Sequence, residues 1–336
     1  MRSFRLPGPV GMIIPLSFIL ISAVHHDNKE FFEHTVRKGE SVSLICIDHY
    51  GQYTREMGAA IKESNPAISD INIIHIGQKL KLKNPDYNTA SKTEQSSGEH
   101  PLFQKNVKVT QGVVTYVEGT ASIIPRGQNS KQTLKTNTIV KPGDLLETAS
   151  NGRVELIINR ESVVRMRENT QMNIEAFRNN AKNSKKTSLG FSFGTVWTKM
   201  RKFTDKVSRF QLELPNAVAG VHGTVYQTVV DPGNGSEVKV YEGEVAVSGN
   251  QKADNSDEAG NHPAGVQEVT GPDEIPGPHE VSMEEWVHIV TSMQKIRIGE
   301  DGIPGKPQSF TKEANDSWEK WNEERDKRIA EIFGEI

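Results

Sequence analysis

The stretch that decides the N-terminal fold is HTVRKGESVSLICIDHYGQYTREMGAAIKESNPAISDINIIHIGQKLKLKN, residues 34–84. Apolar residues recur at helical spacing in two segments, one beginning at Val42 and one around Met57. A Gly-Glu-Ser turn precedes the first segment, and an Asn-Pro pair closes the second. The flanking pieces, His34-Thr35-Val36 and Lys81-Leu82-Lys83, have the character of short strands. The pattern predicts a small βααβ module.

This order of elements, with both of its turns, resembles a LysM domain, the small module that binds glycans containing N-acetylglucosamine. The resemblance covers residues 34–84 and implies peptidoglycan, or another such glycan, as the ligand. In the family the two turns form a shallow groove, where backbone groups hydrogen-bond acetamido groups and apolar side chains contact the sugar rings. A neutral, amide-bearing sugar suits such a site.

The resemblance assigns glycan contacts to residues of both turns. They are Gly39, Glu40, Ser41 and Val42 in the first turn, and Asn65, Pro66, Ile74, His75 and Ile76 in the second. The alternative is that Gly39 and Asn65-Pro66 serve only to form the turns.

The N-terminus has the features of an export signal. Arg2 and Arg5 precede an apolar run without charge from Val10 to Val24, and Ala23 offers a small-residue cleavage site. Residues 1–23 are therefore interpreted as a signal peptide. An uncleaved anchor is the alternative, although the run is shorter than the roughly 20 residues of a full membrane span. Either interpretation places the chain in the periplasm or cell envelope.

Composition gives the broad class. The 336 residues have room for two or three domains, and the net charge of −3 excludes little. Cys46 is the sole cysteine, so no intramolecular disulfide can form, and we expect it to be a small buried apolar residue. Basic residues dominate from Arg160 to Arg209, whereas the tail after Ala253 is acidic. We interpret the basic stretch as a solvated strand face, and no nucleic-acid partner is expected.

Residues 107–248 show short alternating apolar runs, such as Val154, Leu156 and Ile158, separated by Gly, Asn and Pro. Strands at about ten-residue spacing predict an all-β sandwich, barrel or solenoid. The polar segments 85–105 and 249–265 are interpreted as linkers.

Four motifs lie in order within this β segment. They are Gly112-Val113-Val114 with Glu118-Gly119-Thr120-Ala121, Val140 to Thr148 with Gly143-Asp144, Leu189 to Trp197 with Gly194, and Val221-His222-Gly223-Thr224. The segment thereby resembles a FecR domain, the periplasmic module first recognised in ferric-citrate signalling proteins. The resemblance implies a solenoid-like β fold and a protein partner in the envelope. His222 stands where the family usually has Arg.

The resemblance also bears on signalling. Signalling members carry a sigma-binding domain before their membrane helix, whereas only about nine residues precede the apolar run here. We therefore expect any signalling role to need a separate membrane partner.

Residues 266–336 are predicted to form an acidic, partly helical extension. One helix is expected to begin at Val281 and to carry Trp286, Ile289, Val290 and Met293 on one face. A last helix is expected to begin near Asp316, with an apolar stripe of Trp318, Trp321, Ile329 and Ile332. The predicted architecture is thus multidomain α+β: a βααβ module, an all-β solenoid- or sandwich-like domain, and a short helical tail.

No catalytic or metal-binding set is apparent in the sequence. Gly190 to Gly194 fits the Gly-x-Ser-x-Gly pattern around Ser192, but a nucleophile elbow needs a following helix, and Thr195-Val196-Trp197-Thr198 continues as a β-type run. His25, His26 and His34 match no common ligand spacing. We therefore expect no enzyme, cofactor or metal.

The principal functional interpretation is a non-catalytic envelope protein that binds peptidoglycan through residues 34–84 and presents its β domain to a protein partner. The alternative is an envelope signalling component related to FecR regulators, acting through a separate membrane partner.

Overall fold

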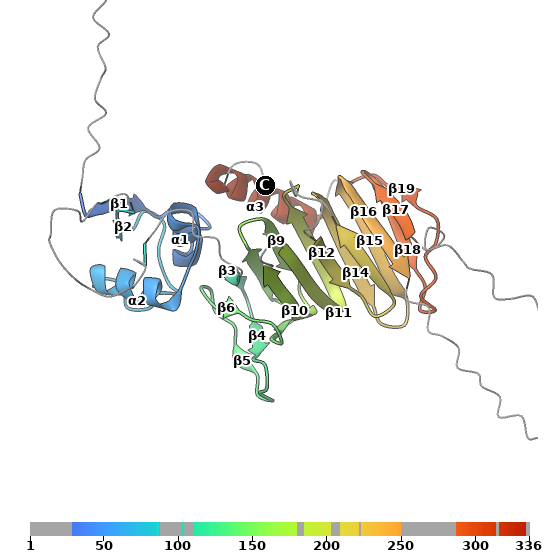
Figure 1. Cartoon of the computed structure of the whole chain (residues 1–336), viewed down its shortest axis with the longest axis horizontal. Coiled ribbons are helices and arrows are strands. Elements are labelled where there is room, and N and C mark those ends of the chain that lie inside the picture. The colour runs from blue at the N-terminus through green and yellow to red at the C-terminus, as the bar shows by residue number, and fades with distance from the viewer. Residues whose placement is uncertain are drawn as a thin grey trace, which may run out of the picture.

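The computed structural model describes residues 29–85, 87, 102–103, 111–179, 185–202, 209–221, 223–249, 287–313 and 316–333. A small βααβ module lies at one end of the molecule, beside a long β domain with a helix packed on it (Figure 1). The apolar run of residues 10–24 lies outside the described residues. Within the described part, no helix is long and apolar enough to cross a membrane.

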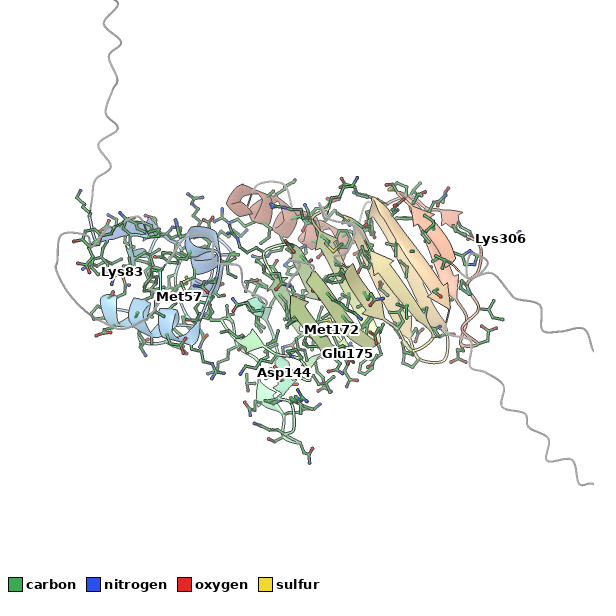
Figure 2. All side chains as sticks on the ribbon, in the orientation of Figure 1. Met57, Lys83, Asp144, Met172, Glu175 and Lys306 are labelled. Carbon is green, nitrogen blue, oxygen red and sulfur yellow. The ribbon has the colours of Figure 1, made fainter. Side chains whose placement is uncertain are left out.

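The N-terminal module has the predicted order of elements: β1 (Phe31–Thr35), α1 (Val42–Tyr50), α2 (Arg55–Ser64) and β2 (Lys79–Lys83). The two strands pair antiparallel. Each helix begins at a hydroxyl cap, because Ser41 and Thr54 accept the N–H groups of Leu44 and Met57, both at 3.2 Å. Figure 2 shows Lys83 at the end of the module away from the β domain.

Helix α1 is buried on nearly every side, because it lies between the rest of the module and the β domain. Its Leu44, Cys46 and Tyr50 are completely buried. Burial raises the pKa of the Cys46 thiol above its ordinary value, so the residue behaves as a small apolar side chain. The prediction for Cys46 is confirmed.

The β domain consists of two sheets. Its first strands are β3 (Gly112–Glu118), β4 (Ala121–Ile124), β5 (Gln132–Thr133), β6 (Ile139–Val140), β7 (Leu145–Thr148), β8 (Arg153–Ile158), β9 (Ser162–Met166) and β10 (Gln171–Asn179). The later strands are β11 (Lys185–Met200), β12 (Arg209–Glu213), β13 (Ala217–Val221), β14 (Val225–Asp231), β15 (Gly235–Glu242), β16 (Glu244–Gly249), β17 (Val287–Thr291), β18 (Gln294–Ile298) and β19 (Gln308–Ser309).

The first sheet runs in the order β6-β3-β8-β9-β11-β14-β15-β18-β19. The second runs β5-β4-β7-β10-β11-β12-β13-β16-β17. Neighbours are antiparallel, except that β11 and β12 are parallel.

The long strand β11 belongs to both sheets and crosses between them at Gly194. Gly194 has φ +105°, and a Cβ there would lie 2.6 Å from the carbonyl oxygen of Asn169. Glycine is required at such a position. Because the strand continues to Met200, the Gly-x-Ser-x-Gly pattern around Ser192 is not a nucleophile elbow.

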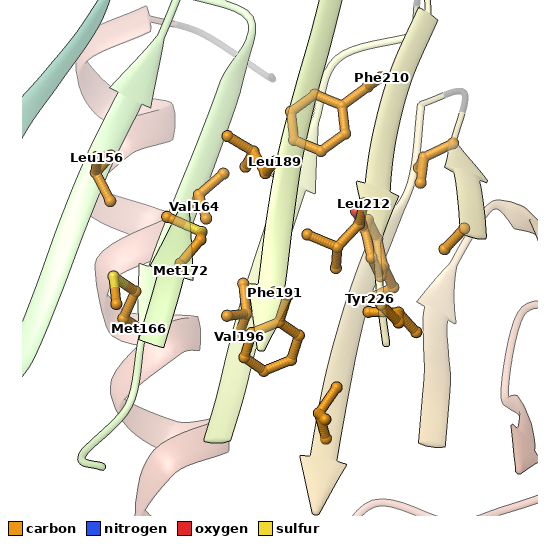
Figure 3. Close-up of a cluster of buried hydrophobic side chains, with 14 of the residues drawn as sticks. Leu156, Val164, Met166, Met172, Leu189, Phe191, Val196, Phe210, Leu212 and Tyr226 are labelled. Carbon is orange, nitrogen blue, oxygen red and sulfur yellow. The ribbon is translucent and has the colours of Figure 1, made fainter. Parts of the chain in front are cut away.

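Side chains from both sheets meet in one hydrophobic core (Figure 3). Six of its members, none more than 2% exposed, are Leu156, Met166, Met172, Phe191, Val196 and Leu212. Burying each large apolar side chain contributes about 1.5–3 kcal/mol. The predicted all-β domain is confirmed, and it has two packed layers.

The Gly143-Asp144 motif has a structural explanation. Asp144, labelled in Figure 2, is buried, and its carboxylate accepts the backbone N–H groups of Arg126 at 3.0 Å and Lys141 at 2.8 Å. Thr148, four residues later, donates its hydroxyl to the carbonyl of Arg167 at 2.6 Å. The motif therefore ties the β6–β7 turn to neighbouring strands, because buried backbone groups need such partners.

The helix predicted from Val281 is wrong where the structure describes it. Strands β17 and β18 replace it, joined by a turn with Met293 at φ +61°. Strand β17 pairs with β16 of the second sheet, and β18 pairs with β15 of the first. The β-branched residues of β17 favour a strand, and this preference outweighs the helical spacing. Residues 281–286 lie outside the described part. Residues 287–309 thus extend the two sheets instead of forming a separate tail.

The last helix, α3 (Ser317–Phe333), begins as predicted after Asp316, whose carboxylate caps it by accepting the N–H groups of Trp318 at 2.7 Å and Glu319 at 3.2 Å. Trp318 and Ile329 are completely buried. The helix lies across the strands of the first sheet (Figure 3), where Glu319 accepts the hydroxyl of Tyr241 in β15. The side chain of Ile332 lies outside the described part.

Candidate functional site

The first turn of the module, residues 37–43, lies where the module, the β domain and α3 meet. Its Gly39 carbonyl accepts a hydrogen bond from Arg325 of α3 at 3.1 Å. The Glu40 side chain is 3% exposed; it forms an ion pair with Arg328 and bonds His34 at 2.9 Å. Helix α3 therefore covers the turn.

The charge of Glu40 is well compensated. Burial acts to raise its pKa, but the hydrogen bonds from His34 and the Arg37 amide, together with the nearby Arg328, outweigh burial and lower the pKa. The carboxylate is therefore ionised at neutral pH and holds α3 against the turn.

Ser41 and Val42 are also occupied by the fold. Ser41 caps α1 with its hydroxyl, and Val42 is 1% exposed within the core. In this arrangement the side chains of Glu40, Ser41 and Val42, predicted as glycan contacts, are not available to a ligand. The reason is that the β domain and α3 cover the turn.

In the second turn, Asn65 joins α2 to β2. Its amide nitrogen donates to the carbonyls of Ile61 at 2.7 Å and Lys81 at 2.9 Å, and its oxygen accepts the Lys81 N–H at 2.7 Å. Asn65 thus has a structural role, as the turn-forming alternative expected. Pro66 next to it is exposed.

The remainder of the second turn is open to solvent. Ile74 is half-buried against the core, whereas His75 is exposed, and Ile76 and the neighbouring Ile73 are 70% and 57% exposed. The turn is hydrogen-bonded, because the Gln78 side chain accepts the His75 N–H at 2.9 Å. Two exposed isoleucines in one turn supply apolar surface for contact with a ligand.

A side chain from the β domain lies between the two turns. The Asn137 amide oxygen accepts the N–H of Ser43 at 2.7 Å, and its nitrogen donates to the Ile71 carbonyl at 3.0 Å and to Asn72 Oδ1 at 3.2 Å. This contact could not be predicted from the sequence, since Ser43 and Asn137 are 94 residues apart.

A buried charge network joins the first sheet to α3. Glu155 of β8 accepts from Arg165 of β9 at 2.8 Å and from Arg325 of α3 at 3.0 Å. Burial alone would raise the pKa of Glu155, but Arg325 and Arg165 lower it to about 2. Because Arg325 also holds the Gly39 carbonyl, the network connects the β domain to the first turn.

A cleft of about 810 Å³ opens beside this network. It is lined by Arg37, Lys38, Gly39, Tyr116, Glu118, Arg153, Trp321, Glu324, Arg325, Lys327, Arg328 and Glu331. The apolar stripe of α3 is evident in the sequence, whereas the roles of Arg325 and Arg328 are not. The two arginines are three residues apart, so they lie on one face of the helix, but this spacing does not predict which residues they contact.

The histidines give no metal site in the described residues. His34 bonds Glu40 and contacts His49 at 3.2 Å, and no group of three or more His, Cys, Asp or Glu is placed there to hold a metal. His25, His26 and His222 lie outside the described residues.

The comparisons with known proteins concern the β domain. Residues 144–246 match the family model of the FecR protein, so this segment is a FecR-family domain. Two crystal structures of a candidate anti-sigma factor from Parabacteroides distasonis ATCC 8503, at 1.65 and 2.50 Å resolution, are similar at 11% identity, with TM-scores of 0.34 and 0.33. The alignments cover 49% of this chain and 59% of that chain. No curated protein matches the sequence.

Proposed function

We propose that the chain is a non-catalytic, FecR-related signalling component of the cell envelope, whose β domain acts by binding another protein. The FecR-family match over residues 144–246 carries this proposal, because that family is regulatory. The matched residues build the central part of both sheets. The apolar run of residues 10–24 supports a place outside the cytoplasm.

A surface for a protein partner is available at β17. Its Val287 and Ile289 are 43% and 50% exposed, and β17 lies at the end of the second sheet. A sheet edge with exposed apolar side chains readily accepts an added strand or a protein surface.

The βααβ module supplies the input in this proposal, by binding a glycan that contains N-acetylglucosamine. The family match does not include residues 34–84, so the glycan assignment is supported by the LysM-like order of elements and by the exposed Ile73 and Ile76. Peptidoglycan is the ligand expected in the envelope.

Transcript profiling tests the signalling role. Deletion of the chain should change the transcription of a defined set of genes, and Ile289→Lys should reproduce that change while the protein remains folded and abundant. Lys306→Glu, a change at another exposed residue, is the control. A deletion strain with an unchanged transcriptome would contradict signalling.

Sedimentation with insoluble peptidoglycan tests the glycan role. Binding by the full chain should be weak, with a Kd of roughly micromolar to millimolar. It should persist at physiological salt, because the proposed contacts are neutral. Ile76→Ser should weaken binding without unfolding the chain. Loss of binding as the salt concentration rises would contradict the proposed neutral contacts.

A further inference from the structure

Asn137 is held with its amide pointed at the module. It lies at φ +68° in the turn 135–138 between β5 and β6, and it is 7% exposed. Its backbone N–H donates to the Val114 carbonyl of β3 at 2.8 Å, which fixes the turn to the β domain. The Asn137 side chain therefore extends from the β domain and hydrogen-bonds the βααβ module.

The hydrogen bonds of this amide match those of an acetamido group. Its carbonyl oxygen accepts the Ser43 N–H, and its nitrogen donates to the Ile71 carbonyl and to Asn72 Oδ1. An N-acetyl group likewise offers one carbonyl acceptor and one N–H donor. The Ser43 N–H can serve one strong acceptor at a time, so two amides cannot both take this position.

The surroundings suit an amide-bearing sugar. Ser43 lies in the first turn of α1, where backbone N–H groups have no partner within the helix. Ile73 and Ile76 are exposed on the same turn that supplies the Ile71 carbonyl, so this turn offers apolar surface for a sugar ring. A few neutral polar groups beside an apolar surface are typical of binding sites for small molecules.

We propose that the Asn137 amide occupies the position, between the two turns of the module, that the acetamido group of a bound glycan would take. An N-acetylated glycan and the docked turn 135–138 therefore exclude one another. This inference rests on the proposed glycan binding and adds its regulation. By linkage, glycan binding loosens the contact between the module and the β domain, and the contact weakens glycan binding by the same factor.

The rest of the interface explains why displacement loosens the two units without separating them. Val113, Ile157 and Val163 of the β domain pack in the same hydrophobic cluster as the module. By contrast, Lys135 in the turn is exposed and Thr138 is half-buried, so moving the turn uncovers little apolar surface.

The test is a calorimetric titration of the full chain with triacetylchitotriose. Asn137→Gly keeps the positive φ and removes the amide, and Asn137→Ala removes the amide while keeping a Cβ. Both should bind about tenfold more tightly than the native chain, which corresponds to about 1.4 kcal/mol. Asn169→Gly is the matched control, since Asn169 is an exposed residue at φ +52° elsewhere in the β domain.

The outcomes separate this inference from the proposed function. If both Asn137 variants bind the sugar with the affinity of the native chain, the proposed competition is wrong and the proposed glycan binding stands. Absence of binding in every chain would overturn both. If Asn137→Gly does not fold, Asn137→Ala decides, because a purely structural Asn137 predicts lower stability with no gain in affinity.

Discussion

The two turns of the βααβ module share a backbone conformation and differ in everything around it. Gly39 in the first has φ +81° and Gly77 in the second has φ +82°. A Cβ on Gly39 would lie 2.5 Å from the Arg325 guanidinium, whereas a Cβ on Gly77 would have no described heavy atom within 4 Å apart from its chain neighbours. Local sequence determines the conformation of each turn, and distant elements determine which turn a ligand can reach.

The first turn is covered by charged side chains of α3, which are paired with carboxylates of the same chain. Arg325 bonds Glu155 and Gly39, and Arg328 pairs with Glu40. The second turn carries no such cover on Ile73 and Ile76. Variants that break these ion pairs should leave the exposure of Ile73 and Ile76 unchanged, which makes the comparison testable.

The largest effect is expected for Glu155→Leu. It leaves Arg325 buried without its carboxylate, whereas Arg165 keeps its ion pair with Asp326 at 2.7 Å. Breaking a buried pair in this way costs about 3–5 kcal/mol. Urea unfolding of the full chain measures the loss. Glu33→Ala removes an exposed pair with Lys79 and should change stability by less than about 0.5 kcal/mol. Equal losses in the two variants would contradict the network's role.

Acid should weaken the same network. Because the pKa of Glu155 is about 2 in the folded chain against an ordinary 4.5, its contribution is fully present above pH 4.5 and is lost as pH falls toward 2. Between pH 5 and 3 the native chain should lose about 2 kcal/mol more stability than Glu155→Gln. Parallel stability curves for the two proteins would refute the assignment.

Gly223 extends the comparison of glycines to the β domain. It has φ +70°, and a Cβ there would lie 2.7 Å from the Cα of Lys202. Gly223→Val should therefore cost about 2–3 kcal/mol in thermal or chemical unfolding. Gly220→Ala is the control, since its nearest neighbour, the Ala246 carbonyl oxygen, is 3.8 Å away. A Gly223→Val chain as stable as the control would contradict this explanation.

A smaller difference is expected between Gly39→Ala and Gly77→Ala. Both introduce a side chain at positive φ, which costs about 1 kcal/mol. Gly39→Ala must in addition displace the Arg325 guanidinium, so it should be less stable than Gly77→Ala by about another 1 kcal/mol. Identical melting temperatures would show that α3 does not hold the first turn.

Much of the fold could be predicted from the sequence, because the spacing of apolar residues and the residues that form turns are local features. The βααβ order and the alternating strands are examples. The prediction of a helix from Val281 was wrong. Ile289, Val290 and Met293 fit a helical spacing, but β-branched side chains and a left-handed turn at Met293 favour two successive strands.

The candidate site was less predictable. The exposure of His75 and Ile76 follows from their turn, whereas the cover of Glu40 by Arg328 and the contact of Ser43 with Asn137 join residues far apart in the chain. Nothing in a turn's own sequence specifies such a partner.

Hydrogen exchange of the native chain with and without saturating triacetylchitotriose tests the central claim most directly. The account predicts slower exchange in residues 72–78, where the sugar binds, and faster exchange in residues 134–141, where the Asn137 and Val114 backbone bonds loosen. Protection of residues 72–78 with no change in residues 134–141 would show that the glycan binds without displacing Asn137, and would contradict the account.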